Sequence, residues 1–236
     1  MRTKLLFSAA AVLAASSLFA SAQIYSANVV GYVQRAVPLN NGANPTYACV
    51  ANPLDTGTNT LINLVQGLPI GSKVLKWNPT LANFSTFTRS TLPGGWSPLN
   101  SGSNTLNPGE SAFISLATTN TSPYTNVFLG TVVQGSSYPN QSVIMLPGFT
   151  ALSFPPAISG AVTNANINLN AYLPNTPSGS QFITWNEVSQ AGYTIATRNA
   201  LPSGWSAVPS ITPGVGFFIN NAASSNRVWT INFTVQ

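Results

Sequence analysis

The sequence contains a long internal duplication, and this feature constrains the fold more than any local motif. The segment Gly71–Asn78 reads GSKVLKWN, and Gly179–Asn186, 108 positions later, reads GSQFITWN. A second segment follows in each copy: RSTLPGGWS at Arg89–Ser97 and RNALPSGWS at Arg198–Ser206, with six of nine positions identical. Matches in the same order and at nearly the same offset indicate two homologous units.

The duplication extends over the rest of each unit. Two further matches belong to it: Leu106–Gly109 with Ile211–Gly214, and Leu129–Gln134 with Ile231–Gln236. We therefore assign residues 23–134 to the first unit and residues 135–236 to the second. Tyr25–Val33, at the start of the first unit, has no clear counterpart at the start of the second.

Within each unit the sequence pattern is that of short strands. Apolar or alternating runs are bounded by Gly, Pro, Asn and Ser, and Val228–Gln236 alternates large apolar residues with polar ones. Helical periodicity is confined to Thr60–Gln66, where we expect one or two turns before Gly67. The pattern predicts an all-β fold with two tandem β-sandwich- or barrel-like units that pack together. An outer-membrane barrel needs strands of roughly ten residues, and the many prolines and short runs argue against it.

The first 22 residues have the pattern of a secretory signal peptide. Arg2 and Lys4 precede an apolar run, Leu5–Ala15, and Ala20-Ser21-Ala22 supplies a small-x-small cleavage site. The apolar run is shorter than the roughly 20 residues of a membrane span. We therefore expect an exported chain, extracellular or periplasmic, that has no membrane span once the signal is removed.

The mature chain is almost uncharged. Once Arg2 and Lys4 are removed, six Lys and Arg remain against three acids, a net charge of +3. The six cations are scattered singly along the chain, whereas nucleic acids and anionic membrane surfaces require clustered ones. We expect neither of these partners.

The chain lacks the residues that most catalytic and metal sites use. It has no histidine, which excludes Ser-His-Asp and Cys-His nucleophile pairs, and one Cys with three scattered acids cannot supply a transition-metal site. Glycoside hydrolysis needs only two carboxylates, but Asp55, Glu110 and Glu187 have no acidic counterpart in the other unit. We predict a non-catalytic protein without a cofactor or a metal.

Cys49 is the only cysteine, and it lies in the apolar stretch Tyr47–Val50. We align it with Leu152 of the second unit and expect it to be a small buried apolar residue. The alternative is an exported thiol that reacts or pairs with another chain.

Tryptophans recur at matching positions in the two units. Trp77 and Trp185 share a strand face with an apolar residue two positions earlier, which favours a place in the core. Trp96 and Trp205 directly follow a glycine, and they either fill the core, which we favour, or form exposed platforms on which sugars stack. In the second case the candidate ligand site comprises Trp96, Trp205, Tyr32, Tyr193, Arg89 and Arg198. The two arginines either stack on the indoles or lie on the surface.

A resemblance adds to this interpretation. The segment Tyr25–Val33 reads YSANVVGYV, and each unit has a Gly-Trp step and a Pro-Gly pair before an aromatic strand. In this combination the chain resembles a group of secreted bacterial proteins without an assigned activity. The resemblance covers nearly the whole mature chain and implies a Gram-negative cell-envelope or extracellular setting, but it transfers no functional residue.

These observations predict a secreted, non-catalytic β-protein that is a structural or adhesive component of the cell surface or extracellular material. The alternative is a carbohydrate-binding module that uses exposed aromatic residues. Val228–Gln236 and Tyr25–Val33 lack the charges and prolines that usually protect edge strands. We expect a terminal segment to close its own sheet or to pair with a neighbouring molecule, so the expected partners are a second copy or an extracellular glycan.

Overall fold

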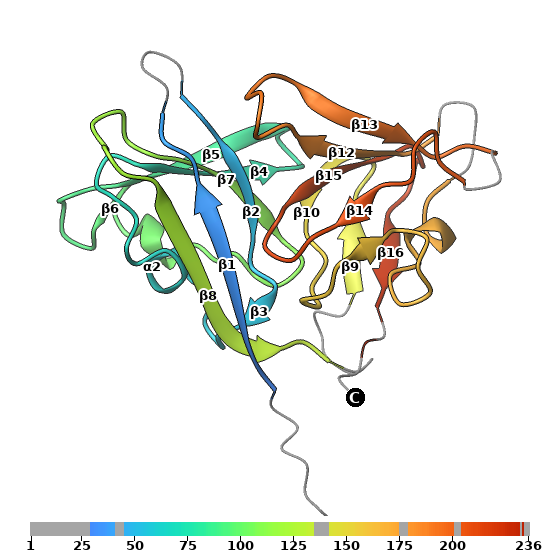
Figure 1. The fold of residues 1–236 in the computed structure, drawn as a ribbon, viewed down its shortest axis with the longest axis horizontal. Helices are drawn as coiled ribbons and strands as arrows, with labels where there is room; N and C mark the ends of the chain where they lie inside the picture. Colours follow the sequence, from blue (N-terminus) through green and yellow to red (C-terminus); the bar gives the residue numbers. More distant parts are fainter. Residues whose placement is uncertain are drawn as a thin grey trace, which may run out of the picture.

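The computed structural model describes residues 29–40, 45–134, 142–174, 179–200, 204–231 and 233. The predicted signal peptide, residues 1–22, lies outside the described residues. The regular structure is almost entirely β-strand, and every strand pair is antiparallel, so the prediction of an all-β fold is confirmed. Figure 1 shows the first half of the chain on the left and the second half on the right.

The first half is a sandwich of two sheets. Its elements are β1 (Val30–Val37), β2 (Ala48–Ala51), β3 (Leu54–Asp55), α2 (Leu61–Leu64), β4 (Lys73–Asn78), β5 (Asn83–Arg89), β6 (Trp96–Ser97), the 3-10 helix η1 (Ser101–Ser103), β7 (Ser111–Ser115) and β8 (Tyr124–Val132). The larger sheet has the strand order β2-β7-β4-β5-β6, and the smaller sheet has the order β1-β8-β3. The short helix α2 lies in the segment where the sequence predicts one or two turns.

The core of the first half lies between these two sheets. Val50, Ile114 and Trp96 contribute from the larger sheet, and Leu54 and Phe128 contribute from the smaller one. All five side chains are buried, because alternate residues of each strand point toward the opposite sheet.

The second half has a similar larger sheet, but two separate two-stranded sheets in place of the three-stranded one. Its elements are β9 (Ser142–Met145), β10 (Gly148–Leu152), β11 (Gly160–Ala161), the 3-10 helix η2 (Leu169–Ala171), β12 (Gln181–Trp185), β13 (Tyr193–Thr197), β14 (Ser210–Ile211), β15 (Phe217–Asn221) and β16 (Arg227–Thr230). The larger sheet has the order β10-β15-β12-β13, and β16 pairs with β9 as β8 pairs with β1. Phe182, Trp205 and Trp229 are among the side chains of its core.

The two larger sheets agree in strand order and in register. Strands β2, β7, β4 and β5 correspond to β10, β15, β12 and β13. Trp77 lies opposite Phe84 in the first sheet, and Trp185 lies opposite Tyr193 in the second. This agreement supports two homologous units, which remain an inference from the sequence.

The structural register corrects the sequence alignment in the outer strands. Cys49 lies opposite Phe113 and Ala151 lies opposite Phe218, so the counterpart of Cys49 is Ala151 and not Leu152. These strands lack the Trp and Gly anchors of the repeated motifs, and an error of one residue exchanges the two faces of a strand.

The same error affects the last strand of each half. The sequence alignment sets Leu129 against Ile231, but Leu129 is exposed and Ile231 is buried. Strand β9 takes the place of β1 in the second half, a correspondence that the sequence did not reveal.

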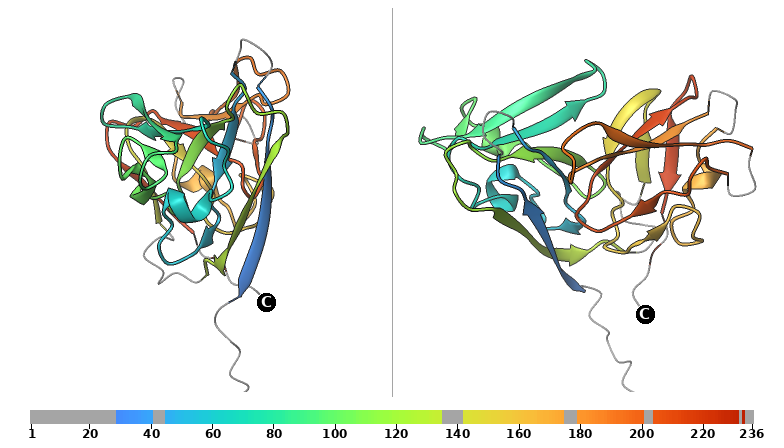
Figure 2. Two further views of the ribbon diagram at one scale, coloured as in Figure 1. Left: turned by 90° about the vertical axis from the view of Figure 1, so that its left-hand side faces the viewer. Right: turned by 45° about the horizontal axis from the view of Figure 1, so that its top comes forward.

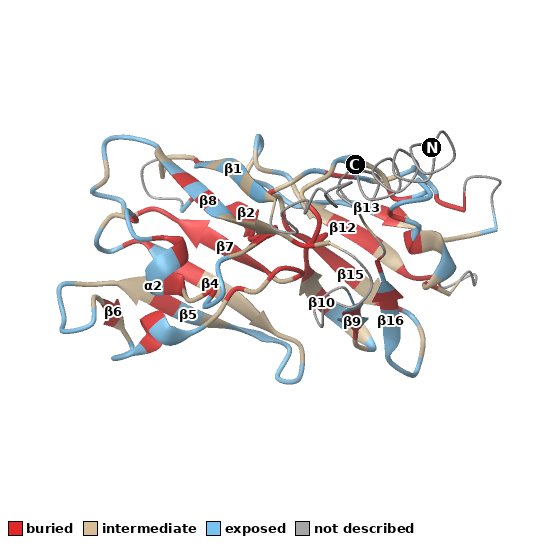
Figure 3. Cartoon of the chain, turned by 90° about the horizontal axis from the view of Figure 1, so that it is seen from below, coloured by how far each residue is buried: buried red, intermediate tan, exposed pale blue. Residues whose placement is uncertain are grey.

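Strands in the middle of the molecule are covered on both faces. One face of each larger sheet packs on the core of its own half, and the other face packs against the second larger sheet. Figure 3 shows buried residues concentrated in β2, β7, β12 and β15. Two-sided burial explains why these strands read as continuous apolar runs and not as alternating ones.

Each terminal strand pairs with a strand of its own half. β1 pairs with β8 over its whole length, and β16 pairs with β9. The expected alternation at the C-terminal end is confirmed as far as the described residues reach, because Trp229 and Ile231 are buried while Val228 and Thr230 are exposed. No helix in the described ranges is long and apolar enough to cross a membrane.

Replacing either core tryptophan by alanine is expected to destabilise the protein strongly. Trp96 and Trp205 are each 1% exposed, so Trp96→Ala and Trp205→Ala should each lower the free energy of unfolding by about 3–5 kcal/mol, which chemical denaturation measures. Tyr32→Ala is the control, because the Tyr32 side chain is exposed and its loss should change the free energy by less than about 0.5 kcal/mol. An unchanged midpoint for both tryptophan variants would contradict their place in the core.

Candidate functional site

The repeated Arg…Gly-Trp motif forms a brace within each half. Arg89 donates from Nη1 to the carbonyl of Gly95 at 2.8 Å, and its Cζ lies 5.7 Å from the centre of the Trp96 ring. Arg198 makes the same hydrogen bond to the carbonyl of Gly204 at 2.7 Å. Both glycines have φ near +75°, and a side chain there would collide with the arginine. The motif is therefore repeated because it holds a turn that requires glycine.

The brace turns the following tryptophan into the core. Trp96 and Trp205 have no ring face open to a ligand, so the predicted sugar-stacking platforms at these two residues are wrong and the favoured place in the core is right. A large aromatic ring gains more free energy from burial than an exposed stacking position offers. Arg89 and Arg198 belong to the same turns and do not form a separate ligand site.

The other two predicted site residues are exposed but do not come together. Tyr32 lies on the outer face of β1, on the side of the first half away from its core. Tyr193 lies on β13, on the face of the second larger sheet that is turned toward the first. The structure thus separates the six predicted ligand residues into two buried braces and two distant tyrosines.

The carboxylate of Glu187 connects the two halves. It accepts a hydrogen bond from the backbone N–H of Cys49 at 2.8 Å and pairs with Arg35 of β1. In the same turn, the Gln190 side chain accepts from the backbone N–H of Tyr47 at 2.7 Å and donates to its carbonyl at 3.0 Å. Side chains of the turn after β12 therefore provide hydrogen-bond partners for backbone groups along the outer edge of β2.

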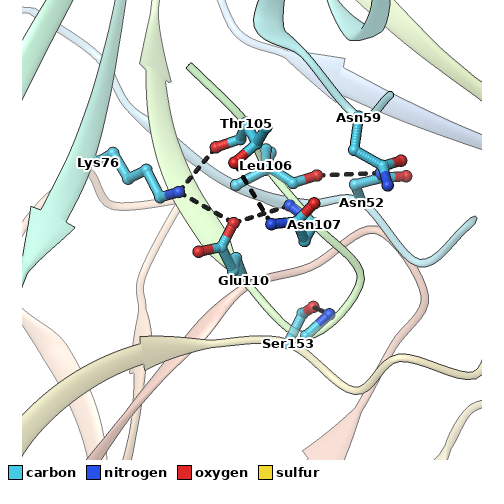
Figure 4. Close-up of polar contacts among 9 residues, drawn as sticks. Asn52, Asn59, Lys76, Thr105, Leu106, Asn107, Glu110 and Ser153 are labelled. Carbon is cyan, nitrogen blue, oxygen red and sulfur yellow. Dashed lines mark hydrogen bonds and ion pairs between the residues drawn. The ribbon is translucent and has the colours of Figure 1, made fainter. Parts of the chain in front are cut away.

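Glu110 belongs to a polar network inside the first half (Figure 4). Its Oε2 accepts from Lys76 Nζ at 2.9 Å and from the backbone N–H of Asn107 at 2.8 Å, and Lys76 also donates to the carbonyl of Thr105 at 2.7 Å. The third acid, Asp55, accepts from the backbone N–H of Gly57 at 2.8 Å. Glu110 and Glu187 each have a cationic partner, and all three carboxylates accept backbone hydrogen bonds, so the acids stabilise loops and interfaces.

An approximate two-fold axis relates the contacts between the halves. Val50 forms an isolated antiparallel bridge with Val215, and Leu152 forms the corresponding bridge with Glu110. A residue shortly before β15 thus pairs with the edge strand β2, and the residue just before β7 pairs with the edge strand β10. Each larger sheet is extended in this way by a loop of the other half.

The indoles of Trp77 and Trp185 follow the same symmetry. Trp77 Nε1 donates to the carbonyl of Phe149 at 2.9 Å, and Trp185 Nε1 donates to the carbonyl of Tyr47 at 3.0 Å. Each indole therefore reaches across to the backbone at the start of the opposite edge strand, to Tyr47 just before β2 and to Phe149 in β10. The sequence favoured a place for both rings in the core of one unit. In the structure both rings lie instead at the interface between the halves.

Two phenylalanines stack where the axis passes. The ring centroids of Phe113 and Phe218 are 6.1 Å apart with an interplanar angle of 27°. Trp77 meets Phe218 edge-on at 5.8 Å, and Trp185 meets Phe113 edge-on at 5.9 Å. Such arrangements add to the free energy gained by burying the rings.

Two cavities open beside this stack, and we call them together the aromatic groove. The first, of about 250 Å³, is lined by Tyr47, Leu75, Phe84, Phe113, Trp185 and Tyr193. The second, of about 370 Å³, has the six corresponding residues: Phe149, Ile183, Tyr193, Phe218, Trp77 and Phe84. Phe84 and Tyr193 line both cavities, so the two lie side by side.

The symmetry fails at one place. Pro79 stands where the second half has Glu187, and a cavity of about 430 Å³, lined in part by Pro79, Lys76 and Ala151, lies beside it. On the other side of the axis, Arg35 and Glu187 form their ion pair.

No family model matches this chain, and no curated protein or solved structure is similar to it. Among the residues that the structure describes, no group of three His, Cys, Asp or Glu side chains could hold a metal ion.

Sequence reasoning found Tyr193 but missed the rest of the aromatic groove. The groove needs both units, and its residues are far apart in the sequence. One signal was present: the large residues Trp77 and Trp185 recur on strands whose other face is already apolar, as Val74 and Phe182 show. A strand with two apolar faces indicates a second packing surface.

Cys49 is expected to be unreactive in the folded protein. It is 2% exposed, and burial, together with the neighbouring Glu187 carboxylate, raises the pKa of its thiol to about 12. Because the thiolate is the reactive form, Ellman's reagent at mildly alkaline pH should modify no thiol until the protein is denatured, and then one per chain. Val188→Cys, at a position that is 99% exposed, provides the control and should react at once. Rapid modification of the native wild type would contradict the burial of Cys49.

Proposed function

We propose that this chain is an exported, non-catalytic β-protein that serves as a structural or adhesive component of the cell surface or extracellular material, and that it associates with further copies through β1. The observation that carries the proposal is the ribbon of β1 and β8, which offers an uncharged, partly apolar face and a strand edge. The Gram-negative setting and the signal peptide belong to the same proposal and rest on the sequence alone.

The outer face of the β1–β8 ribbon contains no charged residue. Its members are Val30, Tyr32, Gln34 and Ala36 on β1, and Thr125, Val127, Leu129 and Thr131 on β8. Val30 is 75% exposed, and Tyr32 and Leu129, which lie directly opposite each other, are 58% and 57% exposed. Exposed apolar patches of this kind on a soluble protein mark interaction surfaces.

The edge of β1 is open to strand addition. In the strand order β1-β8-β3, β8 is the only described neighbour of β1, and Figure 2 (left) shows the two strands along one margin of the molecule. The backbone N–H of Val132 donates to the carbonyl of Val29 at 2.7 Å. Because hydrogen-bonded and non-hydrogen-bonded pairs alternate, the N–H and C=O groups of Val30, Tyr32, Gln34 and Ala36 point away from β8.

A second copy fits this edge. Between Val30 and Val37 there is no Pro or Lys, and the single charge, Arg35, is turned inward to Glu187. Antiparallel pairing of two β1 strands about Val33 sets Arg35 of one copy opposite Gly31 of the other and avoids facing charges. It also continues the apolar face from one molecule to the next.

The carbohydrate-binding alternative has less support. Trp96 and Trp205 are buried, and Tyr32 and Tyr193 lie on separate surfaces, so the predicted residues do not form one sugar site. Binding of an insoluble glycan that is lost in Tyr193→Ala would favour this alternative over the structural role.

Self-association is expected to depend on the free edge of β1. Light scattering of the mature protein over a concentration series should show growth in mass, and Gln34→Pro should abolish it, because proline removes an N–H that points away from β8. Gln34→Thr keeps the N–H and is the matched control. A wild type that stays monomeric at high concentration, or a Gln34→Pro variant that still assembles, would remove self-association from the proposal.

The protein is expected to show no hydrolase activity. The carboxylates of Glu110 and Glu187 are held by Lys76 and Arg35 in separate networks, and neither network contains another acid that could serve as its catalytic partner. Purified protein is tested against a panel of polysaccharides, esters and peptides. Turnover that disappears in Glu110→Gln or Glu187→Gln would contradict the non-catalytic assignment.

A further inference from the structure

The aromatic groove lies outside the surface used in the proposed self-association. The β1–β8 ribbon covers one face of the first half, and the groove lies on the opposite face of the larger sheet, against the second half. A ligand in the groove would therefore not compete with a copy of the protein at β1.

The groove is open although its walls are apolar. Phe149 and Tyr193 are each 47% exposed, and Phe84 and Ile195 on the same walls are also exposed. Folding buries most large apolar side chains, and a cleft that keeps several of them accessible is typical of a ligand site.

Few polar groups line the groove, and the two tyrosine hydroxyls, of Tyr47 and Tyr193, have no hydrogen-bond partner among the described residues. Within the same part of the chain, neither cavity is lined by a charged side chain. Both indole N–H groups donate to backbone carbonyls across the interface, and Gln181 Oε1 accepts from Asn220 at 3.2 Å. Sugars need several hydrogen bonds to their hydroxyls in addition to stacking, and a charged ligand would lose its hydration without a partner. The lining therefore favours an uncharged apolar ligand.

The two cavities set the size of the ligand. A cavity of about 150 Å³ lined by apolar residues is large enough for one benzene ring. The cavities of about 250 and 370 Å³ can each take one ring or one branched alkyl group. Because Phe84 and Tyr193 line both, a single molecule can place one group in each cavity.

We propose that the aromatic groove is a binding site for a small, uncharged, apolar molecule with two ring-sized groups, one for each cavity. The near-symmetry of the site follows from the two-fold relation of the halves: each cavity is closed by one indole, with Trp185 in the first and Trp77 in the second. Phe84 and Tyr193 stand edge-on to these indoles at 5.0 and 5.1 Å and form the shared wall.

The test uses biphenylmethanol as the two-ring probe and benzyl alcohol as the one-ring probe, with binding measured by calorimetric titration. We expect one biphenylmethanol per chain, and two molecules of benzyl alcohol with weaker affinity. Biphenylcarboxylate should bind at least about tenfold more weakly than biphenylmethanol, because its charge loses hydration in the groove.

Three variants locate the site. Tyr193→Ala removes the shared wall and should weaken biphenylmethanol binding by about tenfold or more. Phe149→Ala alters the second cavity alone, so it should weaken biphenylmethanol and reduce benzyl alcohol from two equivalents to one. Val228→Ala, with nearly the same exposure as Phe149 but on β16, should change neither. Melting curves establish that each variant is folded.

Three outcomes would overturn the proposal. The first is no saturable binding of biphenylmethanol to the folded wild type up to its solubility limit. The second is equal binding by wild type, Tyr193→Ala and Phe149→Ala. The third is tighter binding of cellopentaose than of biphenylmethanol, with loss of the sugar in Tyr193→Ala, which would assign the groove to carbohydrate. Each result is independent of whether the protein self-associates through β1.

Discussion

The contact between the two larger sheets is the interaction on which the rest of the structure depends. Each of these sheets has two apolar faces, and its own half can cover only one of them. The second face is covered by the other half through the Phe113–Phe218 stack and the indoles of Trp77 and Trp185. Because this contact is aromatic and satisfies backbone groups on both sides, the two halves pack as one body.

The same contact between the halves also leaves the two cavities of the aromatic groove open. Pairing of backbone groups brings the halves together at β2 and β10, where Val50 and Leu152 bridge to the opposite half. Nearby, the rings of Phe84 and Tyr193 stay partly exposed and leave two matching cavities. Two halves with matching sheets that pack in this way leave two cavities with corresponding linings.

The chain has few charged residues, and two ion pairs connect segments within the protein. Lys76 with Glu110 fixes a loop of the first half, while Arg35 with Glu187 ties β1 to the turn after β12. Turning Arg35 inward leaves the outer face of the β1–β8 ribbon uncharged. The scarcity of charge therefore leaves uncharged surfaces that other molecules can cover.

The sequence by itself determined the all-β class, the duplicated tryptophan motifs, the short helix near Thr60 and the burial of Cys49, because these depend on local pattern and on residue type. It did not determine the register of the outer strands, where Cys49 corresponds to Ala151, since few residues there mark a face. The sequence left Trp96 and Trp205 either in the core or on the surface. The hydrogen bond from the arginine to the glycine carbonyl fixes each turn and directs the tryptophan into the core. Only the tertiary structure decided that Trp77 and Trp185 join the halves and that Phe84 and Tyr193 share a groove, because contacts between residues about 100 positions apart depend on how two sheets pack and leave no local signal in the chain.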